Sequence, residues 1–177
     1  MERVTIPEGT RTHREEARRI TTLRLAVLTV SDSRTMETDE SGAVLRDRMT
    51  SAGHTVVEQE LLPNDEARVR ALVQEWTARD DLDAVLITGG TGLGSRDRTI
   101  EAVRPLLDKE LPGFGEIFRV VSYQEQVGAA AMLSRATAGS VRGRIVVSLP
   151  GSKAAVTLAV EKLLIPELAH AVREVRR

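Results

Sequence analysis

AVLITGGTGLGSRDRT, residues 84–99, passes from an aliphatic run into a glycine-rich stretch and then into a segment with helical character. A short continuous aliphatic run is typical of a strand that is buried on both faces of a parallel sheet. Glycines let backbone N–H groups approach an anion, and the N-terminus of a following helix adds a partial positive charge. The order of strand, loop and helix start therefore predicts a βα unit whose loop, residues 89–94, can hold phosphate.

Other interpretations of this loop remain open from the sequence. Tight turns in α/β folds also require glycine, so one loop alone does not separate a structural turn from a phosphate cradle. The loop is not a P-loop, because Gly94 is followed by Ser95 and not by Lys, and it lacks the dinucleotide fingerprint G-x-G-x-x-G. Asp97 and Thr99 lie where the loop meets the next helix. Each is a candidate N-cap, and Asp97 is also a candidate ligand of Mg2+.

The rest of the chain repeats the alternation of strand and helix. Strands are predicted at residues 24–31, 55–62 and 144–149; helices are predicted after Ser41, at 65–79, at 114–136, and after Pro150, with an interruption at Pro166. Such βαβ units imply an α/β fold in which a mostly parallel sheet is covered by helices on both faces. We expect one domain at residues 23–177 after a polar extension at residues 1–22, whose composition allows it to be disordered.

Composition excludes several classes of function. The net charge of -1 gives no field for attracting nucleic acid, and the absence of cysteine excludes disulfides and thiolate metal sites. No apolar run approaches the roughly 20 residues that cross a bilayer, and the first residues lack the apolar block of a secretory signal. We expect a cytoplasmic protein with no membrane or nucleic-acid partner.

Three glycine-bearing turns each follow a predicted strand. They are SDSR with the nearby DESG (residues 39–42), GGTGLGSRD, and PGS. Because ligands of parallel sheets bind at the carboxyl ends of the strands, these turns are expected to converge. Residues 89–94 and 151–152 are then candidate cradles for a triphosphate or a phosphorylated ligand.

The ordered motifs carry a resemblance to a known family. TGGTG is followed by RD and T-x-EA, then by PGFGE with FR, by SRA-x-AG and by LPGS. In these motifs, from about Arg24 onward, the chain resembles the MoaB/Mog family of molybdenum cofactor biosynthesis proteins. The resemblance implies a three-layer α/β sandwich, assembly as a homo-oligomer (trimer or hexamer), and Mg2+-dependent transfer of AMP from ATP to molybdopterin.

The resemblance also implies a set of site residues. Asp97 is expected to be the essential acidic residue and a metal ligand. The substrate-binding residues are expected to be Ser31, Asp32, Asn64, Gly89, Gly90, Thr91, Gly92, Glu116, Arg119, Ser134, Arg135, Pro150, Gly151 and Ser152.

One position departs from the family pattern. Active adenylyltransferases of the family carry an aspartate just after the second strand, where LLPNDE places Asn64. The adjacent Asp65, one residue out of register, is the candidate to supply the missing catalytic and metal-binding carboxylate. A separate interpretation makes Asn64 only a helix N-cap. The alternative is a molybdopterin-binding or scaffold protein without transferase activity. An unrelated α/β nucleotide-binding enzyme would require the motif order to be coincidence.

Overall fold

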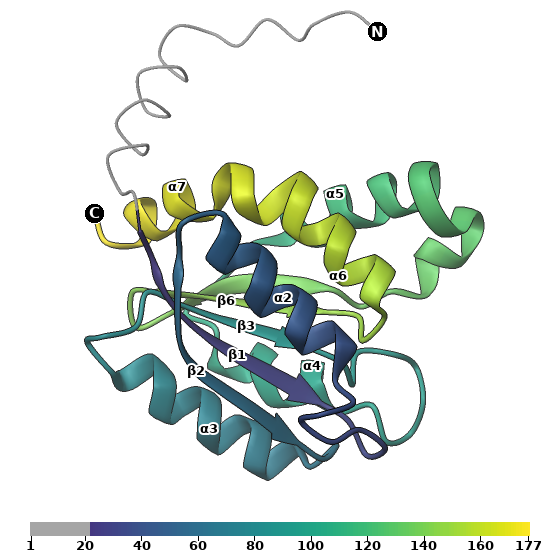
Figure 1. Cartoon of the computed structure of the whole chain (residues 1–177), viewed down its shortest axis with the longest axis horizontal. Helices are drawn as coiled ribbons and strands as arrows, with labels where there is room; N and C mark the ends of the chain where they lie inside the picture. Colours follow the sequence, from purple (N-terminus) through teal and green to yellow (C-terminus); the bar gives the residue numbers. More distant parts are fainter. Residues whose placement is uncertain (1–21) are drawn as a thin grey trace, which may run out of the picture.

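A computed structural model describes residues 22–177, which form a six-stranded sheet in the order β2-β1-β3-β6-β5-β4 (Figure 1). The strands are β1 (Arg24–Val30), β2 (Thr55–Leu62), β3 (Ala84–Thr88), β4 (Lys109–Glu110), β5 (Thr137–Val141) and β6 (Arg144–Leu149). β2, β1, β3 and β6 are parallel, and β5 and β4 continue the sheet in antiparallel fashion. The extension expected at residues 1–22 lies outside the described residues, except for Thr22.

Helices cover both faces of the sheet, as expected from the sequence. α2 (Glu40–Ser51), α5 (Pro112–Ser122), α6 (Lys153–Ala159) and α7 (Ile165–Val175) lie on one face, and α3 (Glu66–Ala78) and α4 (Thr99–Val103) lie on the other (Figure 1). The mostly parallel three-layer α/β fold is confirmed. No helix in the described part of the chain is long and apolar enough to cross a bilayer.

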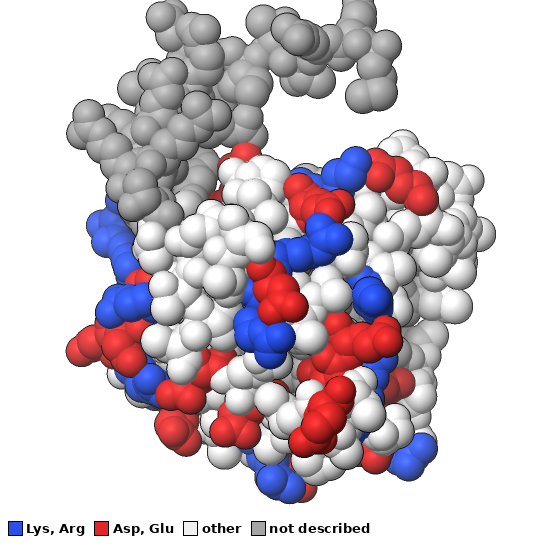
Figure 2. Space-filling model, in the orientation of Figure 1, with Lys and Arg blue, Asp and Glu red and all other residues white. Residues whose placement is uncertain are grey.

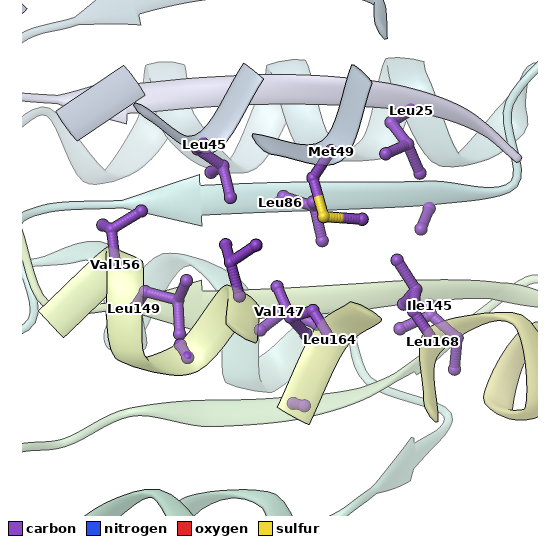
Figure 3. Packing of buried hydrophobic residues seen from close by; sticks show 14 of the residues in the cluster. Leu25, Leu45, Met49, Leu86, Ile145, Val147, Leu149, Val156, Leu164 and Leu168 are labelled. Atoms are coloured by element: carbon purple, nitrogen blue, oxygen red, sulfur yellow. The ribbon is translucent and has the colours of Figure 1, made fainter. Parts of the chain in front are cut away.

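The alternation of side chains along each strand produces two hydrophobic cores. In β1, Leu25 and Val27 belong to the core under α2, α6 and α7, whereas Leu28 belongs to the core under α3 and α4. Figure 3 shows Leu45 and Met49 of α2 against the sheet in the first core. Every strand of the parallel centre is thus buried on two sides, which explains its near-continuous apolar sequence.

The ends of α2 and α3 follow local capping chemistry. α2 ends in a Schellman motif, in which Gly53 has φ +93° and His54 N–H donates to the Met49 carbonyl at 3.1 Å. Gly53 therefore ends the helix at the position after the cap residue Ala52. The N-cap of α3 is Asp65, whose carboxylate accepts the Arg68 N–H at 3.0 Å. The alternative that Asn64 is the cap is wrong, because the helix begins one residue later than that interpretation requires.

The structure modifies one helical prediction and confirms another. The helix expected at 114–136 ends at Ser122 and continues as a π-turn, η2 (Tyr123–Val127), and a 3-10 turn, η3 (Gly128–Leu133). Gly128 has φ +54°, which is incompatible with a continuous α-helix. The interruption expected at Pro166 is confirmed: a π-turn, η4 (Val160–Leu164), precedes it, and the proline, which has no N–H to donate, lies in the first turn of α7.

Candidate functional site

A cavity of about 750 Å3 opens at the carboxyl ends of β1, β3 and β6. The three predicted turns meet there: SDSR after β1, GGTGLGSRD after β3 and PGS after β6. Of the site residues predicted from the sequence, the cavity is lined by Ser31, Asp32, Asn64, Gly89, Gly90, Thr91, Gly92, Asp97, Ser134, Pro150, Gly151 and Ser152. Residues far apart in the sequence are thus brought to one edge of the sheet.

The glycine loop is held in a conformation that only glycine adopts without strain. Gly89 and Gly90 have φ values of +97° and +63°, and a Cβ on Gly89 would collide with the Val30 carbonyl. The Thr99 hydroxyl donates to the Gly89 carbonyl at 2.8 Å and its N–H donates to the Gly90 carbonyl at 3.0 Å. Thr99 therefore fixes the loop. Neither it nor Asp97 caps α4, since Arg98 holds the cap position without a side-chain bond.

The same loop offers free backbone donors. The N–H groups of Gly90, Thr91 and Gly92 donate to no other described residue, and all three residues line the cavity. Gly151 of the PGS turn approaches the loop closely, since a Cβ there would lie 3.2 Å from Gly89 Cα. Unpaired N–H groups at a cavity wall are suited to bind the oxygens of an anion.

The other two turns are shaped by hydroxyl groups. The Ser31 hydroxyl accepts the N–H groups of Ser33 and Arg34, both at 3.3 Å, and so closes the SDSR turn. The Ser152 hydroxyl caps α6 by accepting the Ala155 N–H at 3.2 Å. The Thr88 hydroxyl donates to the Pro150 carbonyl at 2.9 Å, which ties the PGS turn to β3. These bonds fix the cavity wall without occupying the free donors of the glycine loop.

Two carboxylates line the cavity. The Asp97 carboxylate accepts the Gly94 N–H at 3.1 Å and lies close to Gly92, where a Cβ would come within 2.7 Å of its Oδ2. Asp32 accepts the Asn64 N–H at 2.8 Å and faces the Arg96 guanidinium at 3.6 Å. The hydrogen bond from the Asn64 backbone keeps the pKa of Asp32 below its usual value. Asp32 is therefore an anion at neutral pH.

Asn64 and Asp65 point to different places. Asn64 lines the cavity, and its Oδ1 is buried without a hydrogen-bond partner, 2.5 Å from the position that a Cβ on Gly90 would take. Asp65 is not among the lining residues, because its carboxylate caps α3. The structure therefore presents a neutral amide to the cavity at this position and keeps the neighbouring carboxylate outside it.

Arg135 braces the glycine loop from behind. Its guanidinium donates to the carbonyls of Thr91 and Asp97, each at 3.1 Å, and forms an ion pair with Glu101 at 2.5 Å. The hydrogen bond from Arg135 lowers the pKa of Glu101. All three nitrogens of the guanidinium are thus engaged within the protein, and this side chain holds the loop that lines the first cavity.

The PGFGE segment belongs to a second cavity. Glu116, Arg119 and Arg135 line a neighbouring space of about 470 Å3, and Ser134 lines both cavities. Gly115 lets α5 approach β5, since a Cβ there would lie 2.5 Å from the Ala136 carbonyl. The predicted site is therefore divided: one group of residues surrounds the glycine loop and the other lies beyond Ser134.

Three residues around the first cavity were not selected from the sequence. Arg34 lines it, Ser41 donates to the Gly151 carbonyl at 2.9 Å, and Asp39, which is 3% exposed, lies behind both. They belong to the SDSR and DESG motifs, but the sequence did not show that Asp39 is buried, because acidic residues are mostly exposed.

Comparison with known proteins gives consistent matches. Residues 26–170 match the family described as a probable molybdopterin binding domain. Molybdenum cofactor biosynthesis protein B of Bacillus subtilis is 50% identical over 165 residues, covering 93% of this chain and 96% of that protein. The protein of the same name from Halalkalibacterium halodurans is 48% identical over 163 residues, covering 92% and 95%.

Solved structures agree with the sequence matches. The crystal structure of a molybdenum cofactor biosynthesis protein B aligns with a TM-score of 0.85 at 47% identity, covering 88% of this chain and 97% of that chain. The tungsten cofactor synthesizing protein MoaB from Pyrococcus furiosus aligns with a TM-score of 0.79 at 39% identity, covering 88% and 98%.

Proposed function

This chain belongs to the MoaB/Mog family of molybdenum cofactor biosynthesis proteins and contains that family's probable molybdopterin binding domain, and from this premise we propose that it binds molybdopterin and transfers AMP from ATP to it. The observation that carries the proposal is the convergence of three strand-end turns on one cavity whose glycine loop has unpaired N–H groups. Both proposed substrates carry phosphate, which such donors bind.

The chemistry requires positioning more than proton transfer. The terminal phosphate of molybdopterin, already ionised near neutral pH, attacks the α-phosphorus of ATP; a new P–O bond forms and the bond to pyrophosphate breaks. The rigid loop, held by Thr99 and Arg135, fixes the phosphates for an in-line approach. Its N–H groups stabilise the charge that develops on the phosphate oxygens.

We propose that Mg2+ binds in this cavity together with substrate. Among the described residues no cluster of three or more His, Cys, Asp or Glu side chains could hold a metal alone. Mg2+ is commonly bound by one or two carboxylates together with substrate phosphates, and Asp97 is the residue we propose for this role. When bound, the ion would neutralise charge on the leaving pyrophosphate.

A second candidate function is molybdopterin binding without adenylyl transfer. It is favoured by the orientation of Asn64 and Asp65, because the cavity receives an amide where active relatives are expected to place a carboxylate, and Asp65 caps α3 instead. A neutral oxygen binds a divalent cation less strongly than a carboxylate does. Under this candidate the protein presents molybdopterin to another enzyme.

One assay separates these functions. The purified protein is incubated with molybdopterin, Mg2+ and ATP, and adenylylated pterin and pyrophosphate are measured. Both products are expected from the wild type, and Asp97→Asn is expected to lose them while still binding molybdopterin. Binding without product would select the second candidate, and absence of molybdopterin binding would contradict both.

We also propose that the protein acts in the cytoplasm as a homo-oligomer, either a trimer or a hexamer. The exposed apolar side chains of α5 and of the turns after it support the assembly. They lie close together in the sequence, and such apolar surface is typically buried against another protein chain.

A further inference from the structure

Arg34 occupies a position on the cavity wall that the proposed chemistry leaves without a role. It lies in the SDSR turn after β1, where its side chain is 33% exposed and lines the first cavity. Its Nη1 donates to the Ser41 hydroxyl and lies 3.4 Å from Asp39 Oδ1. The guanidinium is therefore anchored at one nitrogen and stays at the cavity wall.

The anchor itself is built into the core of the fold. Asp39 is 3% exposed and accepts hydrogen bonds from the Thr29 hydroxyl and from the Gly42 N–H at 3.0 Å. Gly42 is needed for this approach, since a Cβ there would collide with the Asp39 carboxylate. The Thr29 hydroxyl, the Gly42 N–H and the Arg34 guanidinium thus surround this buried carboxylate, which holds the arginine in place.

The anchor also joins two of the converging turns. The Ser41 hydroxyl accepts from Arg34 and donates to the Gly151 carbonyl at 2.9 Å. Gly151 in turn packs on Gly89 of the glycine loop. These contacts fix the position of Arg34 relative to the free N–H groups of the glycine loop.

Arg34 differs from the other arginines near the cavity in its free donors. Its Nε and Nη2 bond to no described residue. Arg96 is 83% exposed and has only a 3.6 Å contact with Asp32 to hold it. Arg135 uses all of its nitrogens within the protein. Among the arginines near the cavity in the described part of the chain, Arg34 alone combines a fixed position with unused side-chain donors.

We propose that Arg34 binds a phosphoryl group of the ligand through Nε and Nη2. This inference rests on the proposed function, since it assumes that a phosphorylated ligand occupies the first cavity. Two parallel N–H groups of a guanidinium match two oxygens of a phosphate, and such charge-assisted pairs are about twice as strong as neutral hydrogen bonds. The phosphate can come from the ATP chain or from the terminal phosphate of molybdopterin.

The test measures the affinity for each of the two possible sources of the phosphate, ATP and molybdopterin, separately. Affinities for the α,β-methylene analogue of ATP with Mg2+, and for molybdopterin alone, are determined by calorimetry at one fixed salt concentration. Arg34→Gln is expected to weaken one of the two ligands about tenfold or more, because a charged pair is lost. The ligand that is weakened identifies the source of the phosphate. Arg48→Gln is the matched control: Arg48 is 41% exposed, pairs with Glu161 and lies outside the cavity, so both affinities should stay within about threefold of wild type.

A second variant, Arg34→Lys, tests the inference if the Arg34→Gln protein does not fold. Arg34→Lys keeps a charge beside Asp39 but not the two parallel donors, so it should fold and still weaken the same ligand severalfold. Wild-type affinity for both ligands in a folded Arg34→Gln protein overturns the inference, as does wild-type affinity in Arg34→Lys when the glutamine variant does not fold. If the wild type binds neither ligand, the proposed function fails first. If it binds both and Arg34→Gln binds them equally well, only this inference fails.

Discussion

At the scale of single residues, function depends on the direction in which neighbouring side chains point. Asn64 and Asp65 are adjacent, yet one faces the cavity and the other caps a helix. Asp65 has an extended backbone with φ -111° and ψ 108°, the usual N-cap conformation, which turns its carboxylate toward the Arg68 N–H. Within residues 22–177, the carboxylates that line the cavity are thus limited to Asp32 and Asp97.

Changing the charge at position 64 and at position 65 should therefore affect the rate of adenylyl transfer differently. Asn64→Asp adds a carboxylate to the cavity, and we expect the adenylyl transfer rate at limiting Mg2+ to rise about tenfold. Asp65→Ala should leave that rate unchanged but lower the free energy of unfolding by about 1 kcal/mol, because it removes a cap. Rates are measured by product formation, and stability by urea denaturation.

The control for this pair is Asp65→Asn, which keeps a capping oxygen and removes the charge. It should match the wild type in both rate and stability. A large loss of rate in folded Asp65→Asn would show that the Asp65 carboxylate reaches the reacting groups, contrary to the geometry of α3.

At the scale of elements, the close approach of the three turns depends on glycine. Gly89→Ala would place a side chain at φ +97° and against the Val30 carbonyl. We expect the free energy of unfolding to fall by more than about 2 kcal/mol and ligand binding to be lost. Gly113→Ala is the matched control, since a Cβ there would meet no described residue within 4 Å apart from its chain neighbours and the backbone of its own helix. This change should leave stability unchanged or slightly raised. Equal stabilities of the two variants in urea would contradict this account.

The junction of α2 with β1 should make stability depend on pH. Nδ1 of the partly buried His54 accepts the Leu23 N–H at 3.2 Å, and burial lowers the pKa of His54. A lowered folded-state pKa means that the stabilising contribution is present above the unfolded value of about 6.5 and is lost as pH falls below it. His54→Asn keeps an acceptor at the same place without titrating, so its urea stability should fall less than that of the wild type between about pH 7.5 and about pH 5.5. Parallel pH profiles for the two proteins would show that His54 does not contribute.

The sequence predicted the elements that have strong local signals. β1, β3 and β6 are continuous apolar runs, and parallel pairing brings their carboxyl ends together, so the convergence of the turns followed from topology. β5 was missed because TAGSV contains only one large apolar residue, and it becomes a strand by pairing with β6. The roles of Asp65 and Arg135 were also hidden, because side-chain directions in loops depend on backbone angles and on partners distant in sequence.

At the scale of the whole molecule, one stretch of surface is notably apolar. Ile117, Val120 and Tyr123 of α5 and the turn after it are 53%, 54% and 60% exposed, and Met132 of η3 is 77% exposed. Figure 2 shows charged side chains of both signs over much of the visible face. Contiguous exposed apolar side chains are typical of a surface that contacts another protein.

We expect this apolar surface to be buried against other copies of the chain in the homo-oligomer. Light scattering at micromolar concentration should give a mass of several chains for the wild type. Val120→Glu places a charge in the apolar stretch and should shift the protein toward a monomer. Val57→Glu in β2, where Val57 is 42% exposed, is the control and should keep the wild-type mass. A monomeric wild type would contradict the assembly.

The strand order also determines how long each strand lacks its neighbour in the sheet during synthesis. β3 pairs with β1 on one side and with β6 on the other, but β3 ends at Thr88 and β6 begins only at Arg144. At a synthesis rate of about 5–20 residues per second, β6 is synthesised roughly 3 to 11 seconds after β3. Until then, the edge of β3 that pairs with β6 has no partner. An apolar strand with an unpaired edge is a template for pairing with other chains. We therefore expect the nascent chain to be prone to pairing with other chains during this interval.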